Sequence, residues 1–329
     1  MLSNITIQLH QETMPSNFPH GGGVEAAAKA WSCDVSDVLD LSTGLHPAGQ
    51  PDWLGEWLHE HADLAAHYPD VHGEPARSIL ANEFGVKPEQ VLMTAGAQAV
   101  IEVIFQAMQW KSMGVCVPCY HEPIRCAKRA GCRVYAIESG DSFPSVDALW
   151  WTSPNNPFGN AEAFPEGLMG VLDESYMLFS ERRELGLMSD VIRLGSLTKT
   201  FCIPGLRLGY VIADEAIIQK LKAWLPPWPA STLALHLLPK LLPEADMRDL
   251  QVKDARERLV KLLNTYHWQS YQSHASFVLA RPPAAMPNFA KKKILVRTFP
   301  EWEQLQGWVR FGLPYSDDDW QRLEAILCL

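Results

Sequence analysis

Short apolar runs alternate along the chain with segments whose apolar residues follow helical spacing. Runs of this length are typical of strands buried on both faces, and intervening helices are typical of the crossovers between parallel strands. The pattern therefore predicts an α/β fold with a mainly parallel sheet between helices. The expected strands are residues 91–94, 114–117, 133–137, 148–152, 168–173, 191–195 and 206–213.

Helical spacing and turn signals extend the prediction toward both ends of the chain. We expect a last helix at 316–327, because SDDDWQRLEAIL offers a serine N-cap and three acidic residues at the positive end of the helix dipole. The proline-rich stretch LPPWPAS at 225–231 interrupts the α/β pattern. The other expected elements are helices at 23–31, 75–84 and 97–108 and strands at 276–280, 293–299 and 307–313.

The proline-rich interruption indicates a large α/β domain followed by a smaller α+β domain. We expect the large domain over residues 51–230 and the small domain over residues 231–329. Residues 1–50 are irregular apart from one short helix, and we expect this segment to join the small domain. A chain of 329 residues, 47% of them hydrophobic, is long enough to form both cores.

Charge and hydropathy exclude several classes of partner. A formal net charge of −10 disfavours a face that binds nucleic acid, so an anionic ligand must be held by a local site. No apolar run reaches the about 18 residues that cross a membrane, and the N-terminus lacks the basic and apolar regions of a secretory signal. We therefore expect a cytoplasmic protein that binds neither nucleic acid nor membrane.

The cysteines and the clustered histidines do not predict a metal site. Seven cysteines in a chain without an export signal are expected to be free thiols. Cys116 and Cys119 form a C-x-x-C motif, but a zinc knuckle needs a second close pair. The spacing of Cys126 and Cys132 does not provide that pair, and the histidines between residues 59 and 72 show no coherent ligand spacing.

Polar motifs follow the ends of two expected strands, where α/β folds place their ligands. The first expected strand runs into TAGAQ, so the backbone amides of Gly96, Ala97 and Gln98 would face an anion at the start of a helix. After the strand that ends at Thr152, TSPNNPFGN holds Asn156 in a proline-bounded turn. Taken alone, each motif is also compatible with an ordinary surface turn.

A carboxylate and a lysine complete the set. Asp173 ends an apolar strand in LMGVLDESYMLF, which is costly unless a cation or a donor meets it, and Tyr176 lies three residues on. Lys199 in SLTKTFCIPGLRLGY lies among small and apolar residues, with Arg207 beyond a Pro-Gly turn. A phosphate cradle, a carboxylate for a ring nitrogen, donors for a ring oxygen and a lysine nucleophile together describe a site for pyridoxal 5′-phosphate.

With these motifs the chain resembles the fold-type I, aspartate aminotransferase-like enzymes that depend on pyridoxal 5′-phosphate. SLTKTFCIPGLRLGY is similar to the Schiff-base motif of that family, and PNNPFG and DESY are similar to its cofactor motifs, in the same order. The resemblance runs from Asp40 to the end of the chain. It implies that Lys199 binds the cofactor covalently and that Asp173 pairs with the pyridine nitrogen. Asn156 and Tyr176 are implied to donate to the ring O3′.

The resemblance also implies a phosphate site and a stacking aromatic residue. Tyr120 in CVPCYHEP matches the aromatic residue that stacks on the cofactor ring. Gln98 stands where a hydroxyl or an acidic residue is common in the phosphate turn, a departure that leaves the cofactor assignment in place. The implied phosphate ligands are Ser196, Arg207 and the amides of Ala97 and Gln98.

Two further matches concern the substrate and a second subunit. Arg310 in WVRFGL matches the arginine that pairs with the substrate α-carboxylate, a task that suits a bidentate guanidinium. Tyr68 in HYPD matches a tyrosine that the family donates to the phosphate site of a neighbouring subunit, which implies a homodimer. The alternative for Tyr68 is a surface aromatic residue in a loop.

Residue types do not choose between loss of the Cα proton and loss of the carboxylate, because that choice depends on which bond stands perpendicular to the cofactor ring. HGG at 20–22, DLSTGLHP at 40–47 and the lysine motif resemble the cobalamin-pathway L-threonine-O-3-phosphate decarboxylases. The implied product is (R)-1-amino-2-propanol O-phosphate, and Gly44 is a candidate substrate contact. His46 departs from the asparagine more common in that subfamily, so a class I/II aminotransferase such as histidinol-phosphate aminotransferase stays open.

Either substrate carries a phosphate, which predicts further cationic groups. His20 and Arg297, the latter in KILVRTF, are the candidates; a loop histidine and a solvent-facing strand residue are the respective alternatives. A non-catalytic binding module on the same fold is a third hypothesis. The presence of both Lys199 and Asp173 argues against it, because a module without catalysis would be expected to lose them first.

Overall fold

The chain divides into two units, each with its own sheet structure. The computed structural model describes residues 20–138 and 142–328. The large unit consists of Gln50–Asn156 and Ala161–Asp249. The small unit consists of the described residues up to Gly49, of Pro157–Asn160 and of those from Leu250 on.

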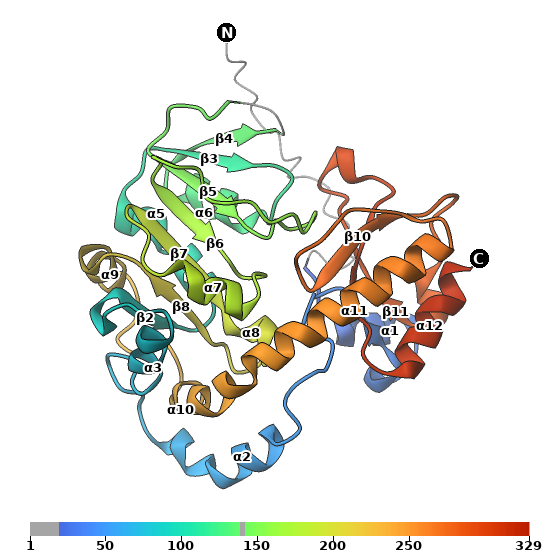
Figure 1. Ribbon diagram of the computed structural model, residues 1–329, viewed down its shortest axis with the longest axis horizontal. Coiled ribbons are helices and arrows are strands. Elements are labelled where there is room, and N and C mark those ends of the chain that lie inside the picture. The colour runs from blue at the N-terminus through green and yellow to red at the C-terminus, as the bar shows by residue number, and fades with distance from the viewer. Residues whose placement is uncertain (1–19, 139–141, 329) are drawn as a thin grey trace. The chain divides into compact units, whose positions relative to one another are not determined.

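The strands of the large unit follow the apolar runs of the sequence. They are β2 (Val91–Thr94), β3 (Ser112–Cys116), β4 (Arg133–Ile137), β5 (Ala148–Thr152), β6 (Gly170–Asp173), β7 (Val191–Ser196) and β8 (Gly209–Ile212). Their order in the sheet is β2-β8-β7-β6-β5-β3-β4 (Figure 1). The neighbours from β7 to β4 run parallel, whereas β8 is antiparallel to both β7 and β2. The predicted α/β fold with a mainly parallel sheet is confirmed.

The helices of the large unit are short. The prediction of one continuous helix at 97–108 is wrong. The segment forms two helices, α4 (Gln98–Ile101) and α5 (Ile104–Met108). The Val103 amide donates to the Val100 carbonyl, three residues back, and the β-branched residues of this stretch favour helix only weakly. The other helices are α2 (Leu54–Glu60), α3 (Ala76–Glu83), α6 (Glu122–Arg129), α7 (Phe179–Leu185), α8 (Leu197–Thr200), α9 (Glu215–Lys222) and α10 (Thr232–Leu241), with 3₁₀ turns at Ala62–Ala66, Pro88–Gln90 and Leu242–Glu244.

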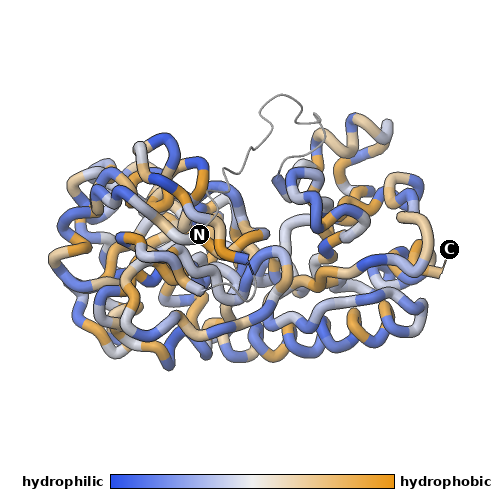
Figure 2. The backbone as a smooth tube through the Cα atoms, turned by 90° about the horizontal axis from the view of Figure 1, so that it is seen from above, coloured by the Kyte–Doolittle hydropathy of each residue, from blue (hydrophilic) through white to orange (hydrophobic). Residues whose placement is uncertain are grey.

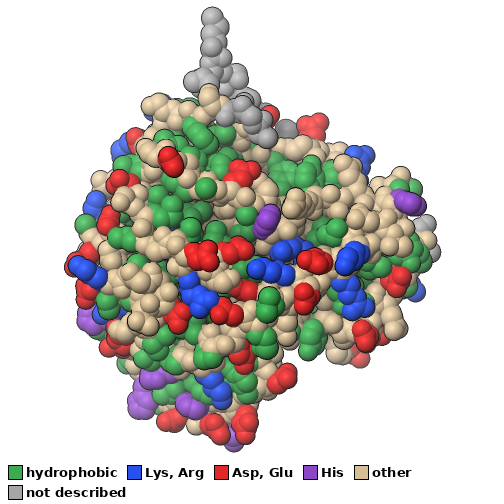
Figure 3. All heavy atoms as spheres, viewed as in Figure 1, with side chains coloured by type: hydrophobic (Ala, Val, Ile, Leu, Met, Phe, Trp, Pro, Cys, Tyr) green, Lys and Arg blue, Asp and Glu red, His purple; other side chains and the backbone are tan. Residues whose placement is uncertain are grey.

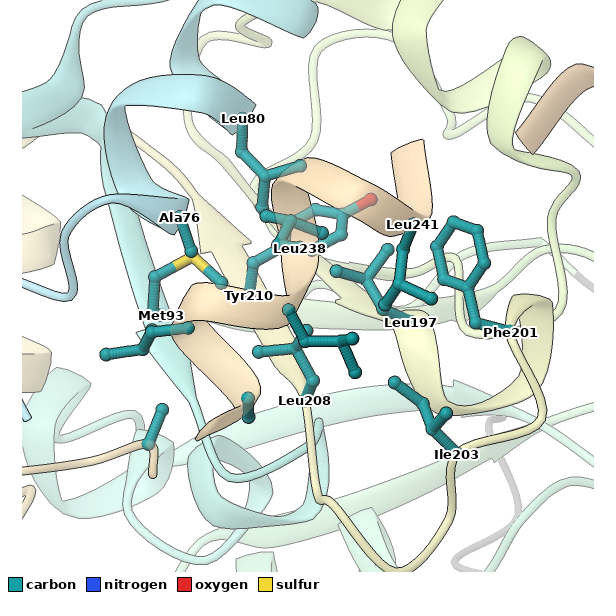
Figure 4. Packing of buried hydrophobic residues seen from close by; sticks show 14 of the residues in the cluster. Ala76, Leu80, Met93, Leu197, Phe201, Ile203, Leu208, Tyr210, Leu238 and Leu241 are labelled. Carbon is teal, nitrogen blue, oxygen red and sulfur yellow. The ribbon is translucent and has the colours of Figure 1, made fainter. Parts of the chain in front are cut away.

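One hydrophobic core of the large unit joins α3 and α10 to β2 and β8 (Figure 4). Leu80 from α3, Met93 from β2 and Tyr210 from β8 are all buried in it. Leu238 and Leu241 on α10 fill the same core. Burying one such leucine contributes about 2 kcal/mol, so α10 is bound tightly to this unit.

The small unit contains two sheets. β1 (Leu39–Asp40) pairs in parallel with β11 (Ile294–Leu295), and an antiparallel sheet has the order β12-β13-β10-β9. The single strand predicted at 293–299 is therefore wrong, because the chain changes partners at Val296, from β1 to β13. The strands of the antiparallel sheet are β9 (Gln269–Ser270), β10 (Phe277–Arg281), β12 (Arg297–Thr298) and β13 (Val309–Gly312).

The last helix begins as the sequence predicts. Ser316 precedes α12 (Asp317–Leu327), and its Oγ accepts the Asp319 amide at 3.1 Å. The Asp319 carboxylate in turn accepts the Ser316 amide at 3.0 Å, which completes a capping box. The small unit also contains α1 (Val24–Trp31) and 3₁₀ turns at Val35–Asp37, Phe289–Lys292 and Glu303–Leu305.

The helix α11 (Ala245–Thr265) contributes to both units, which divide after Asp249. Figure 2 shows hydrophobic and hydrophilic positions alternating along it, as expected of a helix with one buried face. The predicted end of the large domain at residue 230 lies earlier than this division. The leucines of α10 hold that helix in the large unit, and Asp249 accepts the Phe179 amide at 3.1 Å at the start of α7.

Acidic and basic side chains are interspersed on the face of the molecule shown in Figure 3. Over the whole chain the acidic residues are in excess, with a net charge of −10. A site for an anionic ligand must therefore be built from a few local groups. Within residues 20–138 and 142–328, no helix is both long and apolar enough to cross a membrane.

Candidate active site

Lys199 lies on the short helix α8, which follows β7 directly. Leu197 in α8 and Phe201 just after it are buried in the core of Figure 4. Residues four positions apart lie on one face of a helix, so burial of this pair turns Lys199 to the opposite face. Lys199 is half-buried there, and its Nζ lies 4.3 Å from the centroid of the Tyr176 ring.

The parallel register brings several predicted residues to one edge of the sheet. Asp173, the last residue of β6, is the partner of Thr152 on β5 and of Leu194 on β7. The segments that follow these three strands therefore leave the sheet at the same edge, where open α/β sheets bind ligands. Asn156, Tyr176 and Lys199 lie in those segments, and Ser196 is the last residue of β7.

Asp173 is a buried carboxylate, 4% exposed. One of its oxygens accepts the Ser175 amide at 3.0 Å, and no salt bridge to Asp173 occurs among the described residues. Burial raises the pKa of Asp173, although the Lys199 ammonium and the Arg182 guanidinium act in the opposite direction. A carboxylate held in this way is stabilised by a cationic ligand group.

The turn after β2 brings a guanidinium against the backbone. Gly96 has a φ of 78°, and a Cβ at this position would lie 2.6 Å from Nη2 of Arg207. A Cβ on Gly209 would lie 2.8 Å from the amide nitrogen of Ala97, so both approaches require glycine. Arg207 is exposed, and its Nη2 donates to the Ala95 carbonyl at 3.5 Å. A cation beside the amides of a glycine turn is suited to a phosphate group.

Tyr120 lies between β3 and α6 and is half-buried. Its hydroxyl donates to Gln98 Oε1 at 3.2 Å. Burial is the main cause that raises the pKa of Tyr120, and the nearby Glu122 and Asp173 carboxylates add to it. The structure therefore places the predicted stacking residue beside the phosphate turn and within electrostatic reach of Asp173.

These residues of the large unit fit pyridoxal 5′-phosphate. Lys199 offers a half-buried amine, Asp173 a buried carboxylate and Arg207 an exposed guanidinium, and these are the kinds of charged group that the cofactor would need. Any side chain at Gly96 would overlap the Arg207 guanidinium, so glycine allows this cation to approach the turn. Ser196 is buried at the end of β7, three residues before Lys199.

The two predicted substrate arginines lie side by side in the small unit. Arg297 on β12 and Arg310 on β13 occupy directly opposite positions of an antiparallel pair. Nη2 of Arg310, which is 3% exposed, donates to the Ser42 carbonyl at 2.6 Å, and Nη2 of Arg297 donates to Glu301 Oε1 at 2.5 Å. Like charges opposite one another destabilise a sheet, and the Glu301 carboxylate offsets part of this repulsion.

Gly44 and His20 have different surroundings. Gly44 is buried with a φ of 63°, and its carbonyl accepts Ser276 Oγ at 2.6 Å. In the same turn, Nδ1 of the buried His46 accepts the Ala48 amide at 3.1 Å, so the histidine that departs from the subfamily has a local structural contact. His20 is exposed and is the first described residue.

Tyr68 is 79% exposed on the large unit. Its ring stacks on Trp228, with centroids 4.4 Å apart and an angle of 28° between the planes. Both members of this pair are large and exposed, an arrangement that is more typical of an interface than of a loop in water.

Sequence reasoning missed Arg182, which is 1% exposed on α7. Its Nη1 donates to the Ser196 carbonyl at 3.2 Å, and its Nη2 donates to the Ser175 carbonyl and to Thr200 Oγ1 at 3.5 Å each. One guanidinium thus ties together the segments that carry Asp173, Ser196 and Lys199. The sequence around it, FSERREL, is rich in charged residues and is typical of a surface helix. Nothing in the local sequence therefore indicates that Arg182 is buried.

A second missed feature is a fully buried ion pair between Glu174 and Arg193. The Arg193 Nε and Nη2 atoms lie 3.0 to 3.1 Å from the Glu174 carboxylate oxygens, and both side chains have no exposed area. Tyr210 Oη donates to Glu174 Oε1 at 2.9 Å, and Arg193 Nη2 also donates to the Arg182 carbonyl at 2.7 Å. Because Glu174 directly follows Asp173 in sequence, this network holds the segment that carries Asp173 in place.

Replacing Arg193 with methionine is expected to lower the free energy of unfolding by about 3–5 kcal/mol, because the Glu174 charge would stay buried without its partner. Urea unfolding followed by far-UV circular dichroism measures the loss. Arg129→Met is the matched control, since the Arg129–Glu102 pair is largely exposed and such pairs contribute little. Equal effects of the two variants would contradict the stabilising role of the buried pair.

The cysteines are free thiols, as predicted. Burial raises the pKa of Cys116, Cys126 and Cys132 to about 11 each. Such thiols stay protonated at neutral pH, and a protonated thiol is neither a good nucleophile nor a good metal ligand.

Comparison with known proteins identifies the family of the chain. The family model described as aminotransferase class I and II matches residues 36–319. Threonine-phosphate decarboxylase from Pseudomonas aeruginosa is 29% identical over 94% of this chain and 96% of its own length. Histidinol-phosphate aminotransferase from Pyrococcus furiosus is 28% identical over 77% of this chain and 80% of its own length. The solved histidinol-phosphate aminotransferase of Sinorhizobium meliloti, in complex with pyridoxal-5′-phosphate, has a TM-score of 0.82 at 16% identity, covering 100% of this chain and 97% of that chain.

The family match extends over most of the chain and includes both the lysine motif and the strand that ends at Asp173. The solved S. meliloti enzyme has a similar fold. The chain therefore belongs to the class I and II aminotransferase family and is a fold-type I enzyme that depends on pyridoxal 5′-phosphate.

Proposed function

We propose that the protein decarboxylates L-threonine O-3-phosphate to (R)-1-amino-2-propanol O-phosphate and CO₂, as a step of cobalamin biosynthesis. The opposition of Arg297 and Arg310 carries the proposal, because it offers two guanidinium groups to a substrate with a carboxylate and a phosphate. The similarity to threonine-phosphate decarboxylase, which extends over nearly all of both chains, supports it.

In this proposal the large unit holds the cofactor. Bound pyridoxal 5′-phosphate supplies an electron sink for the charge that a broken Cα bond leaves behind. The Asp173 carboxylate keeps the ring nitrogen protonated, and Tyr120 stacks on the ring. Asn156 and Tyr176 donate to the ring O3′. The proposed phosphate ligands are Ser196, Arg207 and the amides of Gly96, Ala97 and Gln98.

The proposed substrate contacts belong to the small unit. Arg310 binds the α-carboxylate and Arg297 binds the phosphate, with Gly44 and His20 as further contacts. The Cα–carboxylate bond breaks, CO₂ leaves with the carboxylate atoms, and Lys199 Nζ delivers a proton to Cα. The product therefore carries the same amine and phosphate as the substrate.

The deciding experiment mixes the purified enzyme, loaded with pyridoxal 5′-phosphate, with L-threonine O-3-phosphate. Release of CO₂ and an amine product lighter than the substrate by one CO₂, without any keto acid, are expected. Conversion of histidinol phosphate only when 2-oxoglutarate is supplied would instead make the protein an aminotransferase, the alternative that the P. furiosus relative supports.

Arg297→Gln is expected to raise the KM for the phosphorylated substrate about 10- to 100-fold and to change kcat much less, because a charge-assisted contact to the phosphate is lost. Steady-state kinetics with L-threonine O-3-phosphate measure both constants. Arg281→Gln, at an exposed position of β10, is the control. An unchanged KM in the Arg297 variant would refute the phosphate role.

We also propose a homodimer that buries Tyr68 and Trp228. Exposed stacked aromatic residues gain most from burial at an interface, where such residues are enriched. The double variant Tyr68→Ala/Trp228→Asp is expected to sediment as a monomer, while Tyr315→Ala, at another exposed tyrosine, should not. A wild-type protein that sediments as a monomer at micromolar concentration would disprove the dimer.

A further inference from the structure

Gln98 is the centre of a polar network that the proposed catalytic roles leave unexplained. Its Nε2 donates to Glu102 Oε1 at 3.0 Å and to Glu122 Oε2 at 3.2 Å. Ionised carboxylates only accept hydrogen bonds, so the amide group must direct its nitrogen toward them. The amide oxygen then faces the other way, and the Tyr120 hydroxyl donates to it at 3.2 Å.

The two carboxylates are fixed in their turn by Arg125. Its Nε lies 2.8 Å from Glu122 Oε2, and its Nη2 lies 2.5 Å from one oxygen each of Glu102 and Glu122. This guanidinium offsets the repulsion between the two acids. Glu122 is buried, and its second oxygen lies 3.1 Å from His121 Nε2. The network therefore joins the phosphate turn, α4 and α6 of the large unit.

The length and the hydrogen-bonding groups of glutamine suit position 98. A serine or threonine there would be too short to reach both the carboxylates and Tyr120. An aspartate or glutamate would add a third negative charge beside Glu102 and Glu122 and could not donate to either. Glutamine, which departs from the residues common at this position, is the type that both donates to the acids and accepts from the tyrosine.

We infer that Gln98 is a positioning residue: held by Glu102 and Glu122, it fixes the orientation of the Tyr120 ring over the cofactor site. The hydroxyl lies at the far end of the tyrosine ring, so a hydrogen bond there restricts rotation of the whole side chain. This inference rests on the stacking role proposed for Tyr120, and it is independent of which reaction the enzyme catalyses.

The test uses Gln98→Met, which preserves side-chain length and removes the donor and the acceptor. We expect the dissociation constant of pyridoxal 5′-phosphate to rise about five- to tenfold, as for the loss of one hydrogen bond, that from Tyr120. The visible circular dichroism of the bound cofactor, which depends on the orientation of the stacked ring, should decrease as well. Gln219→Met, at an exposed position of α9, is the control and should change neither readout.

A double-mutant cycle with Tyr120→Phe separates positioning from general support of the fold. If Gln98 acts through the tyrosine hydroxyl, the double variant binds the cofactor no more weakly than the weaker single variant. Additive effects, or an unchanged circular dichroism signal in Gln98→Met, would overturn the inference. The double variant Glu102→Gln/Glu122→Gln provides a second route if Gln98→Met does not fold. It removes both charges that orient the amide and should reduce the same signal; an unaltered signal there also overturns the inference.

Both readouts are taken without substrate. A protein that failed to decarboxylate L-threonine O-3-phosphate would refute the proposed function and leave these outcomes unchanged. Conversely, additive effects in the cycle would refute the role of Gln98 in an enzyme that decarboxylates normally. The two proposals can therefore fail separately.

Discussion

Lys199→Ala is expected to abolish turnover, with a loss of more than about 10⁴-fold, and to abolish covalent attachment of the cofactor. Lys199 is proposed to act twice, as the amine that binds the cofactor and as the group that moves the proton at Cα. Its helix is anchored by Leu197 and Phe201 on the opposite face, so truncation at Lys199 leaves the packing of α8 intact. The loss should therefore be chemical and should not reflect unfolding.

Borohydride reduction of the loaded protein, followed by peptide mass mapping, measures the attachment directly. The wild-type protein should carry the reduced adduct on the peptide that contains Lys199, and the variant should carry none. Lys220→Ala on α9, an exposed lysine of the same unit, should behave like wild type. Turnover retained by Lys199→Ala, or an adduct on another lysine in the wild type, would refute the central assignment.

Asp173→Asn is expected to slow the reaction about 10²- to 10³-fold while the cofactor stays bound. The carboxylate is the buried group at the edge of the sheet that can hold a protonated ring nitrogen, and asparagine has a similar shape without the charge. Single-turnover kinetics of the loaded variant measure the chemical step, and the retained visible absorption measures binding. Near-normal rates would show that Asp173 is not the partner of the ring nitrogen.

Although Asp173→Asn should slow the reaction, we expect it to increase the stability of the cofactor-free protein. Burial raises the pKa of Asp173, so the folded state binds this proton more tightly than the unfolded state does. The wild type therefore loses stability as the pH rises through the folded-state pKa, and at neutral pH it bears the cost of a buried charge. Asp173→Asn avoids that cost.

Thermal unfolding without cofactor checks the sign of this effect. The variant should exceed the wild type in melting temperature at neutral pH, and the difference should shrink as the solution is acidified and the wild-type carboxyl takes up its proton. A variant that is less stable than wild type at neutral pH would show that hydrogen bonding to Ser175 outweighs the burial of the charge.

Most strands could be predicted from the sequence alone, because short apolar runs between helical segments usually form strands that are buried on both faces. The runs at 133–137 and 148–152 coincide with β4 and β5 to the residue. The failures have local causes. The segment 97–108 has helical apolar spacing but breaks at Val103, and the run KILVRTF at 293–299 looks like one strand but changes sheets at Val296. Periodicity reports which residues are buried, and it does not report which neighbour they pair with.

Some residues of the candidate site could also be predicted from local motifs, and others could not. Lys199, Asp173 and the turns of Gly96 and Asn156 lie in contiguous motifs, whose order along the chain already describes a cofactor site. Arg182 and the Glu174–Arg193 pair have no such signal, because their partners are carbonyls and side chains from other strands.

By itself, the sequence determined the fold class and the cofactor, and it predicted residues that are chemically able to hold that cofactor. It could do so because strand ends, glycine turns and a lysine among apolar neighbours are local properties of the chain. Tertiary structure alone decided which of these groups share one edge of the sheet, that Arg297 lies opposite Arg310, and that Gln98 faces both acids and Tyr120. These relations depend on which strands pair and on contacts between segments far apart in sequence, and the hydrophobic pattern does not identify those partners.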